Sequence, residues 1–355
     1  MKIINKLILG TSCIASSLMM TTVGAADKPV LLKMPIYYGS HLPGLGTPAK
    51  YVADNAALLS GGSVKIKLYE PKKLIGSKEI LDAVSTGKVQ AGYATPGNWG
   101  GKMPAARLFS AVPFGPEAPE YMAWFMYGNG AKLHQELYDK AGYNVKTQTC
   151  GIIAPETSGW FKNEIKSPAD LKGLKMRFFG LGAEVMEKLG VSTVGLPGGE
   201  IFPALEKGAI DATEFSMPAI DKRIGLSKIM KFNYYPGWHQ QATAMELMIN
   251  KDVWKGMSKT QQAVITQLCR AATIDSLANG EAIQAPVMRE NLKNGVKNMY
   301  WSDDMLATFK SKWDEVVAEQ NKKDPEFAHI WKDLSAFRAD YALWSSNAFL
   351  PRKAK

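Results

Sequence analysis

The stretch Ser167–Asp221, SPADLKGLKMRFFGLGAEVMEKLGVSTVGLPGGEIFPALEKGAIDATEFSMPAID, decides the fold of this chain. It alternates short apolar strands with helices that end at glycines; we expect the strands at 174–179, 191–196 and 209–215 and the helices at 182–189 and 200–207. This order predicts an α/β unit with a mostly parallel sheet. Arg177 and Glu214 each fall where a strand ends. Ligands bind beyond the carboxyl ends of parallel strands, so both residues are candidates for a binding site.

A second unit of the same kind precedes this stretch. Strands are expected at 30–38, 63–69 and 89–95, and helices after the turn 43–47 and at 77–86. Shifting the chain by 121 residues brings the two patterns into register and pairs Tyr93 with Glu214, each at a strand end. Two such lobes facing each other would form a cleft.

The first 26 residues have the pattern of a cleavable signal peptide. Lys2 and Lys6 precede a largely apolar run, and Val23-Gly24-Ala25 offers small residues for cleavage. The run is short for a membrane span and is interrupted by polar residues, which argues against a membrane anchor. We therefore expect a mature chain that begins near Ala26 and lies outside the cytoplasm.

Charge and motifs exclude several classes of function. The formal net charge of +10 falls to +8 when the two signal-peptide lysines are removed, but no basic run is interleaved with aromatic residues, so nucleic-acid binding is not expected. The sequence has no Gly-x-Ser-x-Gly or His-Glu-x-x-His motif and no Cys/His cluster, and its four histidines are isolated in sequence. Cys150 and Cys269 could form a disulfide or remain two buried thiols.

Two long helices are expected in the last third of the chain. Ser258 and Gln261 form a capping box that opens a helix to about Asn291, roughly 50 Å long and able to lie across both lobes. A second helix is expected from Pro325 to about Phe349. It carries an apolar seam, spaced 4-3-4-3, of Ile330, Leu334, Phe337, Tyr341 and Trp344. The seam suits packing on the same chain or on a partner subunit equally well.

Three residues could carry chemistry at the cleft. Arg177 lies inside an apolar strand, where its fork of donors could hold a carboxylate with charge-assisted hydrogen bonds, although most arginines are solvated surface residues. Glu214 ends the last strand of the stretch, and Glu156 precedes another apolar run. Paired carboxylates suit acid–base chemistry of a glycosidase or a hard cation, and they can also be unrelated surface acids.

Several motifs in chain order resemble the DctP-type solute-binding proteins of TRAP transporters, most closely their α-keto acid-binding branch. They are Pro43-Gly44-Leu45-Gly46-Thr47, Ala111-Val112-Pro113-Phe114-Gly115, Gly159-Trp160-Phe161, the segment 171–177, Gly199-Glu200-Ile201, the segment 211–214 and the segment 234–238. The resemblance covers essentially the whole mature chain. It implies a periplasmic receptor that delivers an organic anion to a TRAP membrane permease.

The resemblance implies an α/β, two-lobed periplasmic binding protein, a type II-like TRAP solute receptor with a long helix across both lobes. Residues 27–151 and about 241–281 would form lobe I, and 152–240 and about 282–324 lobe II. The C-terminal helix, 325–355, would hold a homodimer, as exchanged helices do in this branch. The expected substrate is a small 2-oxo or 2-hydroxy monocarboxylate of the pyruvate, lactate or α-keto acid type, bound by cleft closure.

By position, Arg177 is similar to the family arginine that binds the ligand carboxylate. Glu214 and Phe215 match positions that bind a cation, which in turn chelates the substrate. The branch usually has Trp at 215, so a backbone carbonyl ligand would survive the change to Phe while the pocket size would differ. Glu156 stands where the branch has Gln. Two protein carboxylates and one substrate carboxylate favour Ca²⁺ over Na⁺, because calcium affinity rises with ligand charge.

Lobe I is expected to supply contacts from Tyr93, Asn98 and Trp99, which follow a strand end and would face Arg177. The alternative function is the same kind of receptor binding a dicarboxylate or an aromatic acid without metal. A secreted hydrolase that uses Glu156 and Glu214 is the remote alternative.

Overall fold

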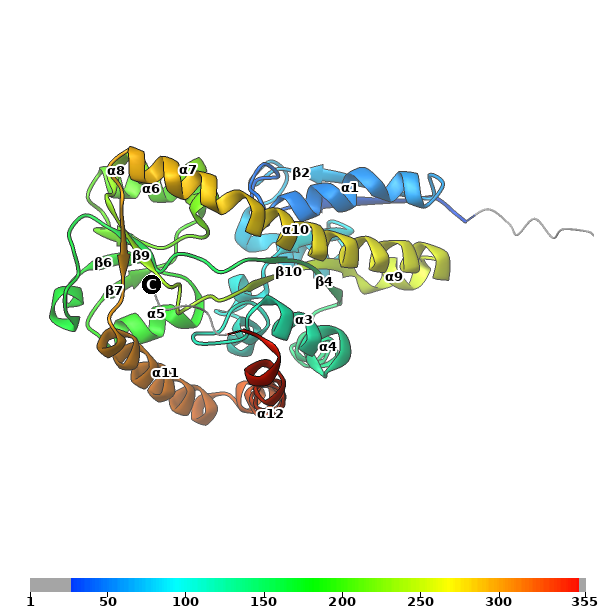
Figure 1. The fold of residues 1–355 in the computed structure, drawn as a ribbon. Coiled ribbons are helices and arrows are strands. Elements are labelled where there is room, and N and C mark those ends of the chain that lie inside the picture. Colours follow the sequence, from blue (N-terminus) through cyan, green and yellow to red (C-terminus); the bar gives the residue numbers. More distant parts are fainter. Residues whose placement is uncertain (1–26, 351–355) are drawn as a thin grey trace, which may run out of the picture.

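The computed structural model describes residues 27–350, so the predicted signal peptide, residues 1–26, lies outside the described residues. Two α/β lobes lie side by side (Figure 1). We call lobe I the part built on strands β1–β4 and β10, and lobe II the part built on strands β5–β9 and β11. No helix in the range 27–350 is both long and apolar enough to cross a membrane.

Lobe I contains a parallel pair and a three-stranded sheet. Strands β1 (Val30–Pro35) and β2 (Val64–Tyr69) are parallel, and a parallel bridge from Ile36 to Tyr93 leads on to β3 (Ala91–Ala94). The second sheet has the order β3-β10-β4, with β10 at Thr243–Asn250 and β4 at Val145–Ile153. Every residue of β10 is buried, as is typical of a strand covered on both faces.

Lobe II contains one six-stranded sheet of order β11-β9-β5-β8-β6-β7. Its strands are β5 (Gly159–Phe161), β6 (Lys175–Arg177), β7 (Ser192–Val194), β8 (Ala212–Thr213), β9 (Phe232–Tyr235) and β11 (Lys297–Tyr300). The three strands predicted in the opening stretch are neighbours, because β6 pairs in parallel with both β7 and β8. Arg177 and Glu214 therefore come from adjacent strands.

One strand in each lobe runs against its neighbours. Strand β10 is antiparallel to β3 and β4, and β5 is antiparallel to β8 and β9. Both strands belong to segments that cross between the lobes: residues 154–158 join β4 to β5, and residues 236–242 join β9 to β10. The mostly parallel sheets predicted from the alternating pattern are thus interrupted where the chain enters from the other lobe.

The shorter helices surround the sheets. They are α1 (Thr47–Leu59), α2 (Ile80–Ser85), α3 (Ala118–Tyr127), α4 (Gly130–Lys140), α5 (Gly180–Glu187), α6 (Gly198–Glu206), α7 (Pro218–Arg223), α8 (Leu226–Ile229) and α9 (Lys251–Gly256). Four 3₁₀ turns complete them, at Ser77–Glu79, Pro96–Trp99, Pro104–Phe109 and Pro168–Leu171. The last of these begins with a capping box of Ser167 and Asp170.

Helix α10 (Lys259–Lys293) spans both lobes (Figure 1). It packs on α1 and β4 of lobe I and on α7 of lobe II, and it opens with the predicted capping box of Ser258 and Gln261. Cys269 of this helix forms a disulfide with Cys150 of β4, across a sequence separation of 119 residues. The long helix is therefore covalently fastened to the lobe I sheet.

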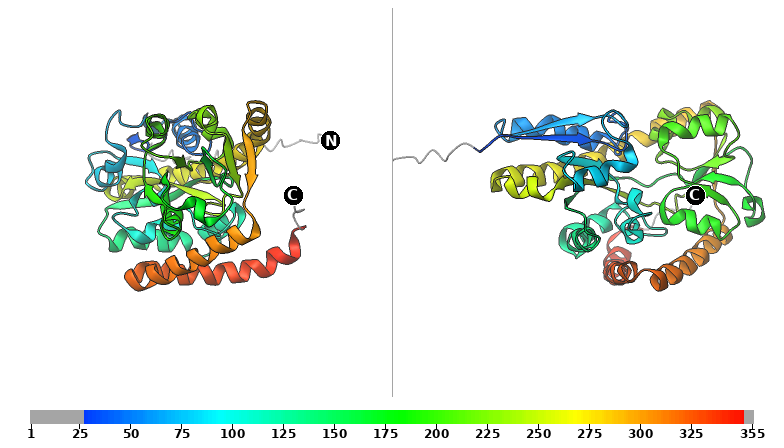
Figure 2. Two further views of the ribbon diagram at one scale, coloured as in Figure 1. Left: turned by 90° about the vertical axis from the view of Figure 1, so that its left-hand side faces the viewer. Right: turned by 180° about the vertical axis from the view of Figure 1, so that it is seen from behind.

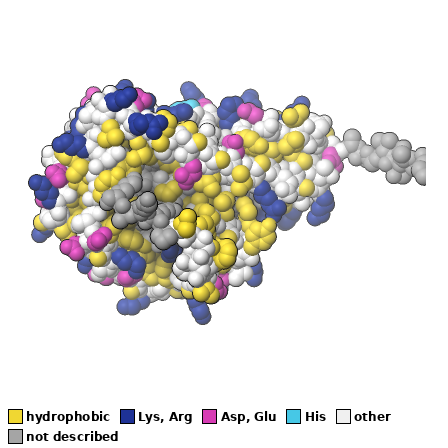
Figure 3. Space-filling view, in the orientation of Figure 1, with side chains coloured by type: hydrophobic (Ala, Val, Ile, Leu, Met, Phe, Trp, Pro, Cys, Tyr) yellow, Lys and Arg dark blue, Asp and Glu magenta, His cyan; other side chains and the backbone are white. Residues whose placement is uncertain are grey.

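Helices α11 (Asp303–Lys323) and α12 (Pro325–Ala348) run along one edge of the molecule (Figure 2). Helix α11 packs on α5 of lobe II, and α12 packs on α3, α4 and the turn Pro104–Phe109 of lobe I. The predicted seam of α12 divides in two. Ile330 and Leu334 are buried on the same chain, whereas Trp344 is 63% exposed. Hydrophobic side chains are abundant on the face of the molecule shown in Figure 3.

Candidate anion and cation site between the lobes

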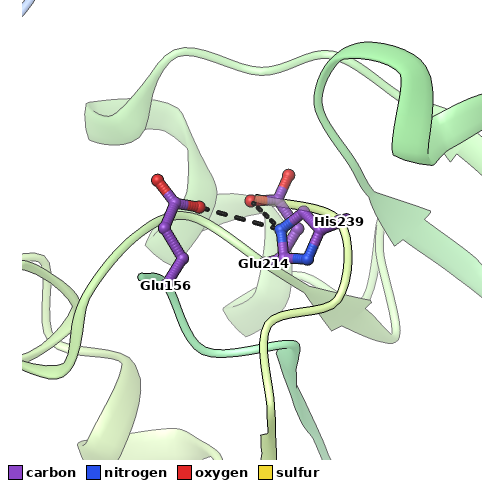
Figure 4. Close-up of side chains that lie close together, drawn as sticks. All are labelled: Glu156, Glu214 and His239. Carbon is purple, nitrogen blue, oxygen red and sulfur yellow. Dashed lines mark ion pairs between the residues drawn. The ribbon is translucent and has the colours of Figure 1, made fainter. Parts of the chain in front are cut away.

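Three titratable side chains converge where the chain crosses between the lobes. Glu156 lies in the first crossing segment, His239 lies in the second, and Glu214 follows β8 of lobe II (Figure 4). Each offers one ligand atom, and these three atoms all lie within 4.8 Å of one another. All three side chains are buried. The cluster therefore joins lobe II to the two crossing segments.

The two crossing segments are held in contact by Gly237 and Gln240. A β-carbon on Gly237 would stand 2.2 Å from the carbonyl oxygen of Glu156, so only glycine permits this approach. The backbone N–H of Glu156 donates to the carbonyl oxygen of Gln240 at 3.2 Å, and Nε2 of Gln240 donates to Oε2 of Glu156 at 2.7 Å. Gln240 thus fixes both the backbone and the carboxylate of Glu156.

Arg177 and Glu214 form a buried ion pair. Nη1 of Arg177 donates to Oε1 of Glu214 at 2.6 Å and to its carbonyl oxygen at 2.7 Å, and Nε donates to the carbonyl of Leu196. The N–H of Phe179 also donates to Oε1 of Glu214. Oε2 of Glu214 has no hydrogen-bond partner among residues 27–350, although it lies 3.6 Å from Nε2 of His239.

The cluster is strongly coupled by charge. Burial alone would raise the pKa of Glu214, but Arg177, His239 and the N–H of Phe179 together lower it below its usual value. Burial raises the pKa of Glu156, with the charge of Glu214 adding to the effect. Burial would lower the pKa of His239, but the two glutamates outweigh it and raise the pKa to about 9. Each charge in the cluster thus depends on the others.

A fourth buried acid, Asp221, connects the loops that carry the two glutamates. Its Oδ2 accepts hydrogen bonds from Nε1 of Trp160 at 2.7 Å and from Oγ1 of Thr157 at 3.3 Å. Its Oδ1 accepts from the N–H of Ser216 at 3.0 Å. Burial holds the pKa of Asp221 well above its usual range. Asp221 therefore fixes the spacing between the segment that follows Glu156 and the segment that follows Glu214.

A cavity of about 440 Å³ lies between the lobes in front of this cluster. Three cationic side chains line it, Lys78 and Arg107 from lobe I and Arg177 from lobe II, together with Tyr37, Tyr38, Asn98, Phe179 and Phe215. The ring centroid of Phe215 lies 5.2 Å from Cζ of Arg177. Among the hydrogen bonds of residues 27–350, Nη2 of Arg177 has none, so this donor remains for a ligand. The cavity thus suits a small anion.

The structure brings most of the predicted site residues together. Arg177, Asn98 and Phe215 line the cavity, while Glu156 and Glu214 lie in the buried cluster behind Arg177. Each of these elements ends at the cleft: β6 and β8 in lobe II, and the turn Pro96–Trp99 in lobe I.

Tyr93 and Trp99 do not line the cavity and do not face Arg177 as expected. Tyr93 points into lobe I, where its hydroxyl donates to the carbonyl oxygen of Cys150 at 3.1 Å. Trp99 is also buried, and its Nε1 donates to Oε1 of Glu246 at 2.7 Å. The tight turn after β3 presents Asn98 to the cleft and rotates the next side chain into the lobe.

The residues missed by the sequence interpretation come from segments far apart in the chain. His239 and Gln240 belong to the segment 236–242 that crosses between the lobes, but no local pattern pairs them with Glu156. Tyr37 and Tyr38 follow β1, so the strand-end argument used for Tyr93 would also have found them. Asp221 closes the opening stretch without any signal that it is buried.

The donor set combines two carboxylates with one imidazole. Glu156, Glu214 and His239 each offer one ligand atom, and Oε2 of Glu214 accepts no hydrogen bond from residues 27–350. A buried carboxylate oxygen without a partner is costly unless an ion or a proton compensates it. Glu156 and Glu214 would hold the ion, with Arg177 free to bind an anionic ligand beside it.

Comparison with known proteins gives a consistent result. The profile of bacterial extracellular solute-binding protein family 7, DctP, matches residues 42–324. A monocarboxylate 2-oxoacid-binding periplasmic protein of Nostoc sp. is 34% identical over 297 residues, which cover 84% of this chain and 81% of that protein.

Two solved structures are similar throughout. A TRAP transporter solute-binding protein from Bordetella bronchiseptica, with calcium and picolinate in its site, has a TM-score of 0.87 at 30% identity and covers 90% of this chain and 95% of its own. A TRAP periplasmic solute-binding protein from Pseudoalteromonas atlantica, with bound sodium and pyruvate, has a TM-score of 0.86 at 30% identity and covers 90% and 97%.

Proposed function

The chain belongs to the DctP family of bacterial extracellular solute-binding proteins, and from this premise we propose that it captures a small 2-oxo or 2-hydroxy monocarboxylate with the help of a bridging cation. Its class is that of a periplasmic solute receptor of a TRAP transporter. The observation that carries the proposal is the buried Glu156–Glu214–His239 cluster directly behind Arg177 at the cavity between the lobes.

The ligand carboxylate would bind Arg177, whose Nη2 remains for it. Two charge-assisted hydrogen bonds of about 1.5–3 kcal/mol each would anchor a small acid. The 2-oxo or 2-hydroxy oxygen, adjacent to that carboxylate, would face the cation held by Glu156, Glu214 and the backbone carbonyl of Phe215. Asn98, from the facing lobe, would complete the enclosure on closure.

We infer calcium rather than sodium as the resident cation. Two protein carboxylates and the ligand carboxylate place three negative charges around the ion, and calcium affinity rises with the charge of its ligands. The related structures hold calcium in one case and sodium in another. Glu156 supplies the second protein carboxylate, and this added charge is what favours calcium over sodium in this chain.

Cleft closure would move the lobes about the crossing segments 154–158 and 236–242. Glu156 and His239 lie in these same segments, so a cation bound there would also fix the hinge. The Lys72–Glu200 and Arg107–Glu184 ion pairs already join the two lobes on either side of the cleft. We further propose that residues 27–151 and about 241–281 form lobe I. Residues 152–240 and about 282–324 would form lobe II.

We also propose a homodimer through the C-terminal helices. At the end of α12 and directly after it, Leu343, Trp344, Phe349 and Leu350 are between 59% and 92% exposed. A groove between these residues and the start of α3 adjoins them and has apolar walls from Pro119, Tyr341 and Phe349. A second copy of the same helix carries the same apolar side chains and would bury these residues in a dimer interface. Sedimentation equilibrium tests this by comparing the molecular mass of the full chain in solution with that of a variant that ends at Tyr341 and lacks these four residues.

Two other functions remain to be separated from this one. A receptor for a dicarboxylate or an aromatic acid would need no metal and would respond equally with a chelator present. A secreted hydrolase would convert its ligand, whereas a receptor would release it unchanged. Membership of a family of solute receptors also argues against catalysis.

A thermal-shift screen tests the proposed function. The ligands are pyruvate, longer 2-oxo acids, lactate and C4-dicarboxylates, each with calcium and with a chelator. A ligand that binds only the folded state raises the melting temperature by mass action, so a 2-oxo monocarboxylate should stabilise the protein only with the cation. A strong shift by a dicarboxylate that ignores the chelator would overturn the substrate assignment, and consumption of any ligand would indicate an enzyme.

A further inference from the structure

Strands β1 and β2 of lobe I leave one face of their sheet open to solvent. Helix α1 packs on the other face, where Leu32, Met34 and Val64 are buried (Figure 1). Parallel strands are usually covered on both faces, so their sequences are apolar throughout. This parallel pair instead alternates, with apolar residues toward α1 and charged residues on the open side. The proposed function gives the open face no role.

The open face is basic. The two strands pair in register, so Leu31 lies beside Lys65 and Lys33 lies beside Lys67 on the same face. Tyr69 follows on this face, with Nζ of Lys67 at 5.4 Å from the centre of its ring. All three lysines are exposed, and none of them forms an ion pair within residues 27–350. We call Leu31, Lys33, Lys65, Lys67 and Tyr69 the basic sheet face.

The acids that flank the two strands are bound to other residues. Asp27, which precedes β1, accepts a hydrogen bond from Oγ of Ser258 at 2.7 Å. Glu70, which follows β2, accepts from the N–H of Ser40 at 3.2 Å. The strands themselves contain no acid. The positive charge of the basic sheet face is therefore available to an anionic partner.

Protection of a sheet edge explains only part of this charge. Lysines on an edge strand prevent its pairing with another sheet, and β2 is such an edge. Lys33, however, lies on β1, which has β2 on one side and the bridge from Ile36 to Tyr93 of β3 on the other. Like charges directly opposite each other also destabilise a strand pair, as Lys33 and Lys67 do here. Edge protection does not require that arrangement.

The basic sheet face also has an apolar component. Leu31 is 51% exposed in the row of lysines, and the ring of Tyr69 lies at its end. Surfaces that lie on membranes combine cations, which attract anionic headgroups, with apolar and aromatic side chains that enter the boundary of the acyl chains. A receptor of a TRAP transporter delivers its ligand at a membrane, so a lipid surface is next to it when it works.

We propose that the basic sheet face binds the surface of an anionic phospholipid bilayer and thereby holds the receptor near the membrane that contains its permease. Each lysine close to an anionic surface contributes about a fivefold gain in affinity, so the three together contribute about 100-fold. Binding of this strength is reversible and lets the receptor leave the membrane again. Lobe I therefore faces the membrane in the bound state.

Sedimentation of the mature chain with lipid vesicles tests the proposal. Vesicles of zwitterionic phosphatidylcholine alone are compared with vesicles that also contain anionic phosphatidylglycerol. Each measurement is made at low salt and again at about 1 M salt, where charges are screened beyond about 3 Å. The wild-type chain should bind the anionic vesicles at low salt, and it should bind neither the zwitterionic vesicles nor the anionic vesicles at high salt.

Two variants separate the charged and apolar components. Lys33→Gln/Lys65→Gln/Lys67→Gln should lower the partition coefficient on anionic vesicles by about 100-fold. Leu31→Ser should lower it by about fourfold, the factor that burial of one methylene contributes. Pyruvate affinity should stay within about twofold of wild type in both variants, because none of these residues lines the cavity between the lobes. An unchanged pyruvate affinity also shows that the variants are folded.

The matched control removes the same charge elsewhere on the surface. Lys172 and Lys207 of lobe II and Lys332 of α12 are exposed lysines, so Lys172→Gln/Lys207→Gln/Lys332→Gln has the same net charge as the first variant. Its partition should stay within about threefold of wild type.

Several results would overturn the proposal. Equal partition of the two triple variants would mean that net charge, and not the basic sheet face, determines binding. Equal binding of the wild type to zwitterionic and anionic vesicles, or to neither, would exclude an anionic lipid as the partner. Wild-type binding to soluble polyglutamate but not to anionic vesicles would assign the face to an acidic protein. Partition of Leu31→Ser equal to that of wild type would contradict entry of this side chain into the bilayer surface.

Discussion

Gly97 of lobe I lies directly against the ring of Phe179 of lobe II: a β-carbon at 97 would stand 2.6 Å from Cζ of Phe179. Gly97 and Phe179 both line the cavity between the lobes, so the two lobes touch at its edge. The absence of a side chain at 97 is what permits the lobes to close to this distance.

Gly97→Ala should therefore weaken ligand binding. Overpacking of this kind costs about 1–3 kcal/mol, so we expect a loss of roughly 5- to 150-fold in ligand affinity measured by isothermal titration. Gly101→Ala is the control on the same cavity, because a β-carbon there meets nothing within 4 Å. Ser110 Oγ also lies 2.8 Å from the added carbon. If Gly97→Ala/Phe179→Leu recovers no affinity, Ser110 and not lobe closure causes the loss.

Arg177→Lys should abolish tight binding while keeping the charge beside Glu214. A lysine cannot reproduce the planar fork that donates to Glu214 and to a ligand at once, so we expect at least a tenfold loss of affinity for pyruvate. Truncation to alanine is a poorer test, because it leaves the carboxylate of Glu214 buried without its arginine, at a cost of about 3–5 kcal/mol in stability. Arg338→Lys, far from the cleft on α12, is the matched control. Equal pyruvate affinity in Arg177→Lys and wild type would exclude Arg177 as the anchor.

Asp221→Asn should weaken cation binding without changing the ligand cavity. The amide keeps the shape of the side chain but loses one of the two acceptor oxygens that join Trp160 and Ser216. Residues that orient metal ligands typically change metal affinity by about 10- to 100-fold, and we expect a calcium affinity lower by about tenfold. Asp139→Asn, a surface acid paired with Lys251, controls for the loss of charge. Calcium affinity equal to that of the control would show that Asp221 has only a structural role.

Removal of the disulfide should lower stability and leave binding intact. Cys150 and Cys269 close a loop of about 120 residues, and the chain-entropy account gives about 5 kcal/mol for a loop of that length. The bond lies between β4 and α10, and neither cysteine lines the cavity between the lobes. Denaturant unfolding of Cys150→Ser/Cys269→Ser should thus show a lower free energy of unfolding, with pyruvate affinity within about twofold. A large loss of affinity would mean that the bond also sets the lobe geometry.

Local signals were sufficient for the elements of each lobe. The capping box at Ser258 and the glycines that end the helices are properties of neighbouring residues, so helix positions were predicted within a few residues. The position of Arg177 and Glu214 at the ends of two strands followed from the alternation of strands and helices.

Long-range relationships were not accessible from the sequence. The antiparallel strands β5 and β10 arise because the chain crosses between lobes, and nothing within either segment records its neighbours. His239 lies 83 residues from Glu156 and carries no motif, so only the fold brings them together. The rotation of Trp99 into lobe I toward Glu246 depends on a single tight turn and on a buried acceptor far along the chain.

The most direct test of the account is the coupling between the cation and the ligand. Isothermal titration of pyruvate into the protein should be carried out with saturating calcium and again with a chelator, with Glu156→Gln as the variant. Since the ion bridges protein and ligand, we expect at least a hundredfold weaker pyruvate binding in chelator, and by linkage the same factor in calcium affinity when pyruvate is present. In the Glu156→Gln variant, the affinity for pyruvate should depend less strongly on calcium. Equal pyruvate affinity with calcium and with chelator, unchanged in Glu156→Gln, would contradict a cation-bridged carboxylate site.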